Sequence, residues 1–241
     1  MTLESGDKSG AVFAVIPARK GSKRVVRKNV RDFRGQTLLE WSIKAALATP
    51  EISKVIVSTD DEEAIEIAKQ FPVIVLPRPT ELSTDTSDTF DVLRHVVLKQ
   101  LTELELYPEL LVLLQVTSPL REKDLISKGL KKLMADSKSD RLIELNRSPF
   151  FTGSVASGYW VSDFPENTRS QDLPFVYFPS GRLYIYRIKE TIAKNDPDGL
   201  NTCFLLGDYS ENINIDEESD FEKLEYVYSM RIKKFSYLLR N

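Results

Sequence analysis

The chain has 241 residues, 41% of them hydrophobic and 29% charged, and its formal net charge is −3. This composition is typical of a globular domain and argues against a nucleic-acid partner, which needs a strongly positive surface. The single cysteine and single histidine exclude an internal disulfide, a cysteine-based zinc site and a multi-histidine metal site. Because no apolar run approaches the ~20 residues that cross a bilayer, we expect a cytoplasmic protein without a membrane partner.

The first half of the chain alternates between strand and helix signals. An apolar strand is expected at residues 12–16, and a capping box at Thr37 and Glu40 opens a helix that Pro50 stops. Further strands are expected at 54–58, 73–76 and 110–114, with helices at 61–70, 87–104 and 122–134. This order predicts a three-layer α/β fold with a doubly wound, mostly parallel, Rossmann-like sheet.

The pattern changes after residue 140. Residues 146–182 predict no long helix and are rich in serine, proline, glycine and aromatic residues. Such a stretch in a compact domain is usually functional or an interface, so we interpret 140–180 as a β-rich excursion that packs on a second subunit. The alternative is a flap over the chain's own core. Strands at 183–187 and 203–206 and helices at 189–194 and 217–230 complete a single domain over 11–241, preceded by a flexible tail at 1–10.

The loop after the first strand is strongly cationic. Between residues 17 and 29 it holds six cations together with Gly21, Ser22 and Asn29. It matches neither the dinucleotide-binding glycine pattern nor the phosphate loop of nucleotide triphosphatases. Since Lys and Arg are the usual partners of phosphate, the loop indicates a nucleotide site built on side-chain cations. The alternative is a solvated basic loop.

Three other polar segments follow expected strands, where parallel sheets bind ligands. The segment at 77–89 is either a plain helix cap or a contact for a base or phosphate. In the segment at 115–121, Arg121 either holds a substrate carboxylate or forms a salt bridge at a helix start. Alternation places Asn212, Asn214 and Asp216 on one face, which suits either Mg²⁺ or a helix cap.

Together these motifs resemble the acylneuraminate cytidylyltransferase family, also called CMP-sialic acid synthetases. The resemblance covers about residues 11–225 and is specific because nine segments occur in the family's order. They are residues 16–23, 27–29, 57–60, 78–82, 85–87, 114–121, 169–172, 181–185 and 215–216.

The resemblance implies a Rossmann-like nucleotidyltransferase and homodimer that transfers CMP from CTP to a nine-carbon 2-keto-3-deoxy sugar acid, with Mg²⁺ as cofactor and pyrophosphate as the second product. The catalytic residues it implies are Arg19, Lys23 and Asp216, and the metal ligands are Asp216 and Asn214. Nucleotide contacts are implied for Arg19, Gly21, Ser22, Lys23, Asn29, Arg78, Thr86, Ser87 and Thr89. Sugar contacts are implied for Gln115, Thr117, Arg121, Arg182 and, from the partner subunit, Arg169.

Three departures from the family pattern bear on function. Asn214 replaces the first aspartate of the usual metal pair, and Lys20 replaces a glycine in the opening loop. Ser180-Gly181-Arg182 replaces Asn-Gly-Ala, which suggests an altered acceptor such as a legionaminic or pseudaminic acid. Two alternatives stay open: a cytidylyltransferase for an eight-carbon acid such as Kdo, and a non-catalytic nucleotide-binding dimer.

Overall fold

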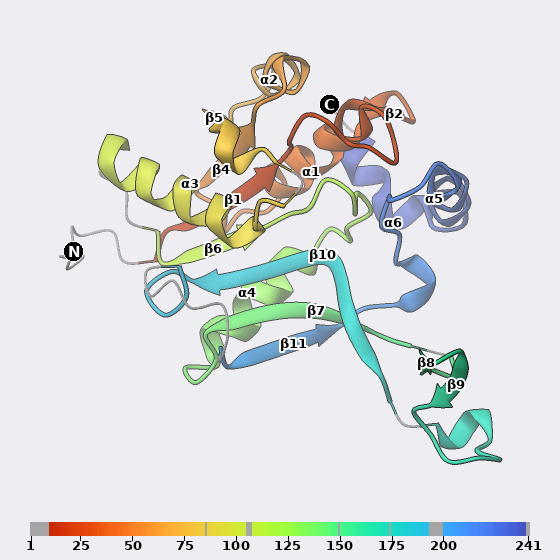
Figure 1. Ribbon diagram of the computed structural model, residues 1–241. Coiled ribbons are helices and arrows are strands. Elements are labelled where there is room, and N and C mark those ends of the chain that lie inside the picture. The colour runs from red at the N-terminus through yellow and green to blue at the C-terminus, as the bar shows by residue number, and fades with distance from the viewer. Residues whose placement is uncertain are drawn as a thin grey trace.

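A computed structural model describes residues 10–84, 86–104, 108–148, 150–173, 175–192 and 200–239 (Figure 1). The expected tail before Gly10, Asp85 of the 77–89 segment and the last two residues of the helix expected at 189–194 lie outside the described residues.

One seven-stranded sheet organises the chain, in the order β11-β7-β10-β6-β1-β4-β5. All neighbouring strands run parallel except β10, which is antiparallel to both β6 and β7. The prediction of a doubly wound, mostly parallel sheet is therefore confirmed. The strands are β1 (Val12–Pro17), β4 (Lys54–Thr59), β5 (Ile74–Pro77), β6 (Leu110–Leu113), β7 (Arg141–Arg147), β10 (Tyr177–Arg187) and β11 (Thr202–Leu206).

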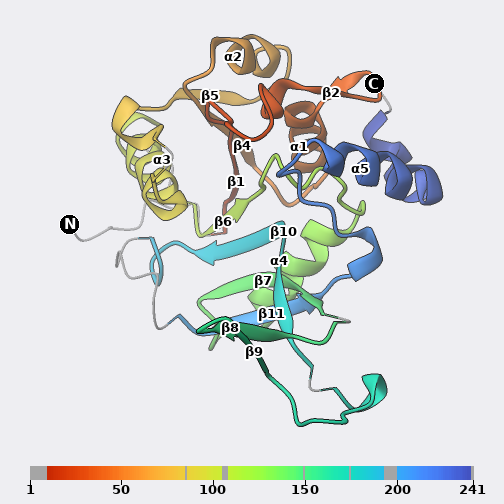
Figure 2. The same ribbon diagram turned by 45° about the vertical axis from the view of Figure 1, so that its right-hand side comes forward.

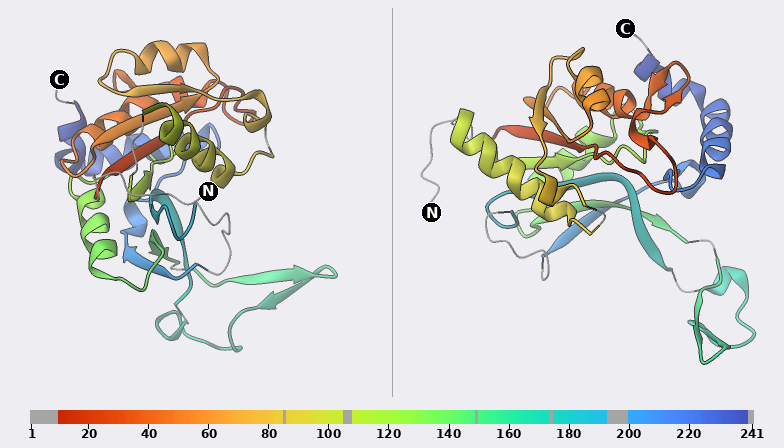
Figure 3. Two further views of the ribbon diagram at one scale, coloured as in Figure 1. Left: turned by 90° about the vertical axis from the view of Figure 1, so that its left-hand side faces the viewer. Right: turned by 45° about the horizontal axis from the view of Figure 1, so that its top comes forward.

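Helices cover both faces of the sheet (Figures 1 and 3). Side chains alternate along β1, so Ala14 and Ile16 join the core under most of the helices, whereas Phe13 and Val15 pack toward α3. One face of the sheet is covered by α3 (Thr89–Leu104). The opposite core takes residues from α1 (Leu38–Leu47), α2 (Glu62–Ala68), α4 (Leu125–Ala135), α5 (Ser219–Met230) and α6 (Ile232–Phe235).

The local signals give mixed outcomes. The capping box is confirmed, since the Thr37 hydroxyl accepts from Glu40 N at 3.3 Å and the Glu40 carboxylate accepts from Thr37 N at 2.6 Å. The helix expected at 189–194 is wrong for its described part, because residues 189–192 form turns. Strand β7 was not predicted, because Glu144 and Asn146 occupy buried positions on it and interrupt the apolar alternation.

The excursion after β7 extends away from the body of the molecule, and it begins with a hairpin of β8 (Gly153–Ala156) and β9 (Tyr159–Ser162) (Figures 1 and 3). The segment after β9 projects below the sheet in Figure 2. The aromatic side chains of the excursion stay exposed: Tyr159 to 76%, Phe150 to 61%, and Trp160 and Phe175 each to 59%. Rings this exposed favour the second-subunit interpretation over the flap, and both interpretations stay predictions. A short hairpin of β2 (Asp32–Phe33) and β3 (Gln36–Thr37) precedes α1.

Across the described ranges, none of the helices combines the length and the apolar character needed to cross a bilayer.

Candidate active site

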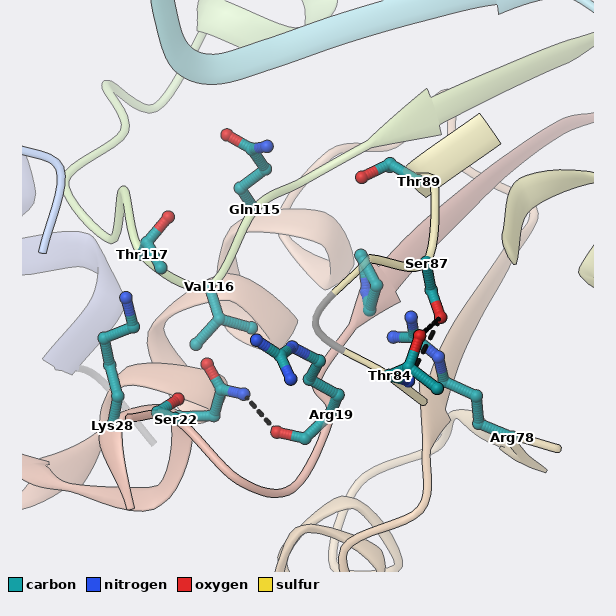
Figure 4. Close-up of a pocket in the computed structure, with 12 residues that line it drawn as sticks. Arg19, Ser22, Lys28, Arg78, Thr84, Ser87, Thr89, Gln115, Val116 and Thr117 are labelled. Carbon is teal, nitrogen blue, oxygen red and sulfur yellow. Dashed lines mark hydrogen bonds between the residues drawn. The ribbon is translucent and has the colours of Figure 1, made fainter. Parts of the chain in front are cut away.

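The pocket of interest lies where the strand order reverses. From β1 the chain adds β4 and β5 on one side, then crosses through α3 to β6 on the other side of β1. At such a switch point the loops after the two central strands diverge and leave a crevice. Here it is a cavity of about 210 Å³ (Figure 4). Its lining comprises Pro17, Arg19, Ser22, Lys28, Asn29, Arg78, Thr84, Ser87, Thr89, Gln115, Val116 and Thr117.

The backbone that carries Arg19 is held on both sides. Ala18 N donates to Ser58 O at 2.9 Å, and the Thr59 hydroxyl donates to Ala18 O at 2.5 Å. Asn29 Nδ2 donates to Arg19 O at 2.9 Å. These bonds fix the start of the loop, and the Arg19 guanidinium points into the middle of the pocket in Figure 4.

The pocket carries an excess of positive charge. Arg19, Lys28 and Arg78 are among its lining residues, and none of the lining residues that the structure describes carries a carboxylate. Burial lowers the pKa of the Arg78 guanidinium, an effect that Asp60 opposes and Arg19 reinforces. Arg19 and Arg78 repel each other, so an anion bound between them relieves an electrostatic cost. The arrangement is suited to bind phosphate groups.

Hydroxyl groups line the edge of the pocket beside Arg78. Ser87 Oγ lies 2.8 Å from Thr84 Oγ1 and accepts from Thr84 N at 3.0 Å. Thr86 Oγ1 lies 3.2 Å from Thr84 Oγ1, although Thr86 itself is not in the lining. Thr84 was missed by residue-level prediction, and the only signal for it was its position in the polar segment at 77–89.

The loop after β6 forms the opposite wall. The Gln115 amide points away from Arg19, and Lys28 reaches toward Thr117 (Figure 4). Thr117 O accepts from Ile215 N at 2.7 Å, which joins the segment at 212–216 to this wall. Lys28, also missed as an individual site residue, donates from Nζ to Ile215 O at 2.6 Å.

Asp216 therefore lies beside the pocket, among cations. Its Oδ1 is 3.2 Å from Arg24 Nη2 and 3.3 Å from Lys28 Nζ, and its Oδ2 accepts from Asn214 Nδ2 at 2.8 Å. The described part of the chain contains no group of three or more His, Cys, Asp or Glu side chains that forms a metal cage. One partly exposed carboxylate next to a cationic pocket nevertheless fits a cation that takes most of its ligands from a bound polyanion and water.

Two predicted sugar contacts require correction. Arg121 is fully buried and donates to Arg182 O at 2.8 Å, to Ser42 Oγ at 3.1 Å and to Gln115 O at 2.6 Å. Burial lowers its pKa to about 9. Arg182 is 1% exposed and pairs with Glu144. Both guanidinium groups therefore lie behind the wall of the site and contact the protein interior.

Other predicted residues lie outside the pocket lining. Gly21, at φ +84°, and Lys23 occupy an exposed turn of the cationic loop. Arg169 sits on the excursion, where its Nε donates to Asp172 Oδ2 at 2.6 Å. The cavity thus brings together the predicted residues Arg19, Ser22, Asn29, Arg78, Ser87, Thr89, Gln115 and Thr117.

Comparison with known proteins identifies similar chains. The family model described as cytidylyltransferase matches residues 13–204. The chain is 30% identical over 219 residues to an N-acylneuraminate cytidylyltransferase from Escherichia coli, covering 88% of this chain and 50% of the relative. It is 30% identical over 228 residues to a CMP-N,N'-diacetyllegionaminic acid synthase from Legionella pneumophila, covering 91% of this chain and 97% of the relative. It thus spans about half the length of the first relative and nearly all of the second.

Solved structures share the fold. A CMP:2-keto-3-deoxy-manno-octonic acid synthetase complexed with CTP superposes with a TM-score of 0.67 at 17% identity, covering 91% of this chain and 99% of the other. A 4-diphosphocytidyl-2C-methyl-D-erythritol synthase gives a TM-score of 0.66 at 14% identity, with coverage of 90% and 99%.

Proposed function

Because the chain belongs to the cytidylyltransferase family, we propose that it transfers CMP from CTP to the anomeric hydroxyl of a nine-carbon 2-keto-3-deoxy sugar acid of the sialic, legionaminic or pseudaminic type. The observation that carries this proposal is the three-cation pocket at the switch point between β1 and β6. In the reaction the anomeric oxygen bonds to the α-phosphorus, the bond between the α-phosphorus and its bridging oxygen breaks, and pyrophosphate leaves. The hydroxyl proton passes to solvent.

The nucleotide side of the site is built for charge neutralisation. A triphosphate carries about four negative charges at neutral pH, and phosphoryl transfer depends mainly on positioning and on stabilising that charge. We assign the phosphates to Arg19, Lys28 and the neighbouring Lys23. Arg78 and the hydroxyls of Thr84, Thr86, Ser87 and Thr89 take the ribose and cytosine, with Gly21, Ser22 and Asn29 shaping the loop.

The acceptor side is assigned to Gln115 and Thr117. They follow the most central buried strand, and the Gln115 amide points away from the phosphate-binding cations (Figure 4). A sugar bound on this side would meet the nucleotide between the loops that follow β1 and β6.

Members of the family generally use a divalent metal, and we propose Mg²⁺ for this chain. Asp216 would hold it, with Asn214 beside, and the remaining ligand positions would be left to the nucleotide and water. When bound, the ion polarises the α-phosphate and offsets charge on the leaving pyrophosphate.

We also propose a homodimer through residues 140–180, in the cytoplasm. The support is the exposed aromatic set on the excursion, together with Phe204 and Leu206 on the edge strand β11, which are 44% and 61% exposed. Contiguous exposed apolar side chains mark interaction surfaces. Arg169 lies on the same excursion, and in the proposed dimer it enters the partner's active site.

The test is pyrophosphate release from CTP with a panel of sugar acids that includes sialic, legionaminic and pseudaminic acids and Kdo. We expect turnover with a nine-carbon acid. Turnover with Kdo alone would select the eight-carbon alternative, and no turnover with any acid despite CTP binding would select the non-catalytic dimer.

A further inference from the structure

A buried ion pair lies beneath the acceptor side of the site. Glu144 and Arg182 are each 1% exposed, and Glu144 Oε2 accepts from Arg182 Nε at 2.9 Å while Oε1 accepts from Arg182 Nη2. Ser180 Oγ donates to the same carboxylate at 2.6 Å and accepts from Arg182 N at 3.1 Å. The carboxylate therefore fixes both the guanidinium and the backbone turn that precedes it.

The pair connects to the pocket through Arg121. Arg121 Nε donates to Arg182 O at 2.8 Å, and its Nη2 donates to Gln115 O at 2.6 Å. Gln115 lines the pocket, so the Arg121 side chain links the backbone of a pocket residue to the backbone carbonyl of Arg182.

A second connection runs through Gly181. The register of β10 on β7 shifts between Pro179 and Tyr184, and Gly181 has φ +80° within this bulge. A Cβ at Gly181 would lie 2.7 Å from Ser118 Oγ and 3.1 Å from Gln115 Oε1. The backbone of the turn is thus packed so closely against Ser118 and the Gln115 side chain that a Cβ does not fit. Bulges of this kind commonly change the direction of side chains beside active sites.

Ser118 extends this wall toward the candidate metal ligand. Its hydroxyl donates to Asn214 Oδ1 at 3.3 Å, and Asn214 Nδ2 donates to Asp216 Oδ2 at 2.8 Å. The bulge at Gly181 therefore lies against Gln115 and is linked to Asp216 through Ser118 and Asn214.

Stability alone does not account for the pair. A buried ion pair is often no more stabilising than apolar residues of similar volume, because both charges lose their hydration. Unlike apolar residues, the pair fixes the orientation of its neighbours, because the Arg182 guanidinium and the Glu144 carboxylate each make several directional hydrogen bonds.

We propose that Glu144 and Arg182 are positioning residues that set the acceptor wall, Gln115 and Gly181, for the sugar acid. The proposal rests on the proposed function and deepens it. It also gives a role to Arg182, which stands where the family pattern has alanine. The buried arginine would act on the acceptor through the wall residues and would not touch the sugar itself.

The test is the double variant Glu144→Leu/Arg182→Met, which removes both charges together and leaves neither buried alone. We expect the KM for the acceptor to rise about tenfold or more, while the Kd for CTP, measured by calorimetry without acceptor, stays within about twofold. The matched control is Arg187→Met. Arg187 lies at the other end of β10, where it donates to Leu133 O at 2.7 Å and to Ser139 O at 3.1 Å, so its loss lowers Tm and leaves both the acceptor KM and the CTP Kd unchanged.

A milder variant keeps the test decisive if the double variant does not fold. Ser180→Ala retains the ion pair and removes two bonds to the turn, and we expect about a threefold to fivefold rise in acceptor KM. An acceptor KM unchanged in a folded variant, or a matching change in the CTP Kd, overturns the positioning role. Wild-type protein without turnover on any acid overturns the proposed function and this role with it, whereas wild-type turnover with an unmoved variant KM overturns the role alone.

Discussion

Replacing Arg19 by alanine tests the phosphate assignment most sharply. The loop is anchored through the Arg19 carbonyl, which Asn29 holds at 2.9 Å, and through Ala18, so the substitution leaves these backbone bonds in place. The removed guanidinium also stood near Arg78, whose pKa it lowers, so its loss relieves repulsion in the free protein. We therefore expect a folded variant whose Tm lies within about 2 °C of wild type.

The effect on activity follows from the lost charge-assisted bonds. Such bonds contribute about 1.5–3 kcal/mol each, and 1.36 kcal/mol corresponds to a factor of ten. One strong bond to phosphate therefore predicts a fall of about 10- to 160-fold in kcat/KM for CTP. Lys28 and Arg78 remain and retain part of the binding.

The assay is steady-state pyrophosphate release at varied CTP, with Arg19→Lys and Arg141→Ala as comparisons. Arg19→Lys keeps the charge without the planar fork and should fall between wild type and alanine. Arg141 donates to Thr202 Oγ1 at 2.8 Å at the far edge of the sheet, so its loss should leave the CTP constants unchanged. A folded Arg19→Ala variant with wild-type kcat/KM for CTP would refute the reasoning.

Three further outcomes are expected. Asn29→Ala removes the bond to the Arg19 carbonyl at 2.9 Å and should lower kcat/KM for CTP by about tenfold; an unaltered constant would separate Asn29 from the site. Asn214→Asp replaces the amide that donates to Asp216 at 2.8 Å by a second carboxylate, so the Tm of the metal-free protein should fall and Mg²⁺ should restore it. The Mg²⁺ concentration that gives half-maximal activity should also be lower than in wild type. The same Mg²⁺ dependence in variant and wild type would place the ion elsewhere. Trp160→Glu puts a charge into the proposed interface and should halve the mass measured by light scattering; a monomeric wild type would contradict the dimer.

The layers of the fold were predictable because local signals agreed with the global arrangement. The apolar strand before residue 17, the capping box at Thr37 and the buried run at 110–114 each follow from side-chain periodicity. The carboxyl-end rule then placed Arg19, Arg78 and Gln115 at one edge of the sheet, and the cavity brings them together.

The features that could not be predicted from the sequence are buried polar residues. Glu144 and Asn146 are buried polar residues on β7, so apolar alternation fails there and the strand goes unrecognised. Arg121 and Arg182 are of the residue type that usually faces solvent or a ligand, and only tertiary pairing reveals that they support the wall from within. Contacts between residues far apart in the sequence do not alter the local periodicity of apolar side chains, so this periodicity cannot predict them.

The central claim is that CTP bound in this pocket is attacked at its α-phosphorus by a sugar acid. CTP labelled at the α- or γ-phosphorus, incubated with Mg²⁺ and a nine-carbon 2-keto-3-deoxy acid, tests it directly. We predict that the α-label appears in an acceptor-dependent CMP-sugar and the γ-label only in pyrophosphate. A γ-label transferred to the sugar, or release of label that does not depend on the acid, would contradict the account.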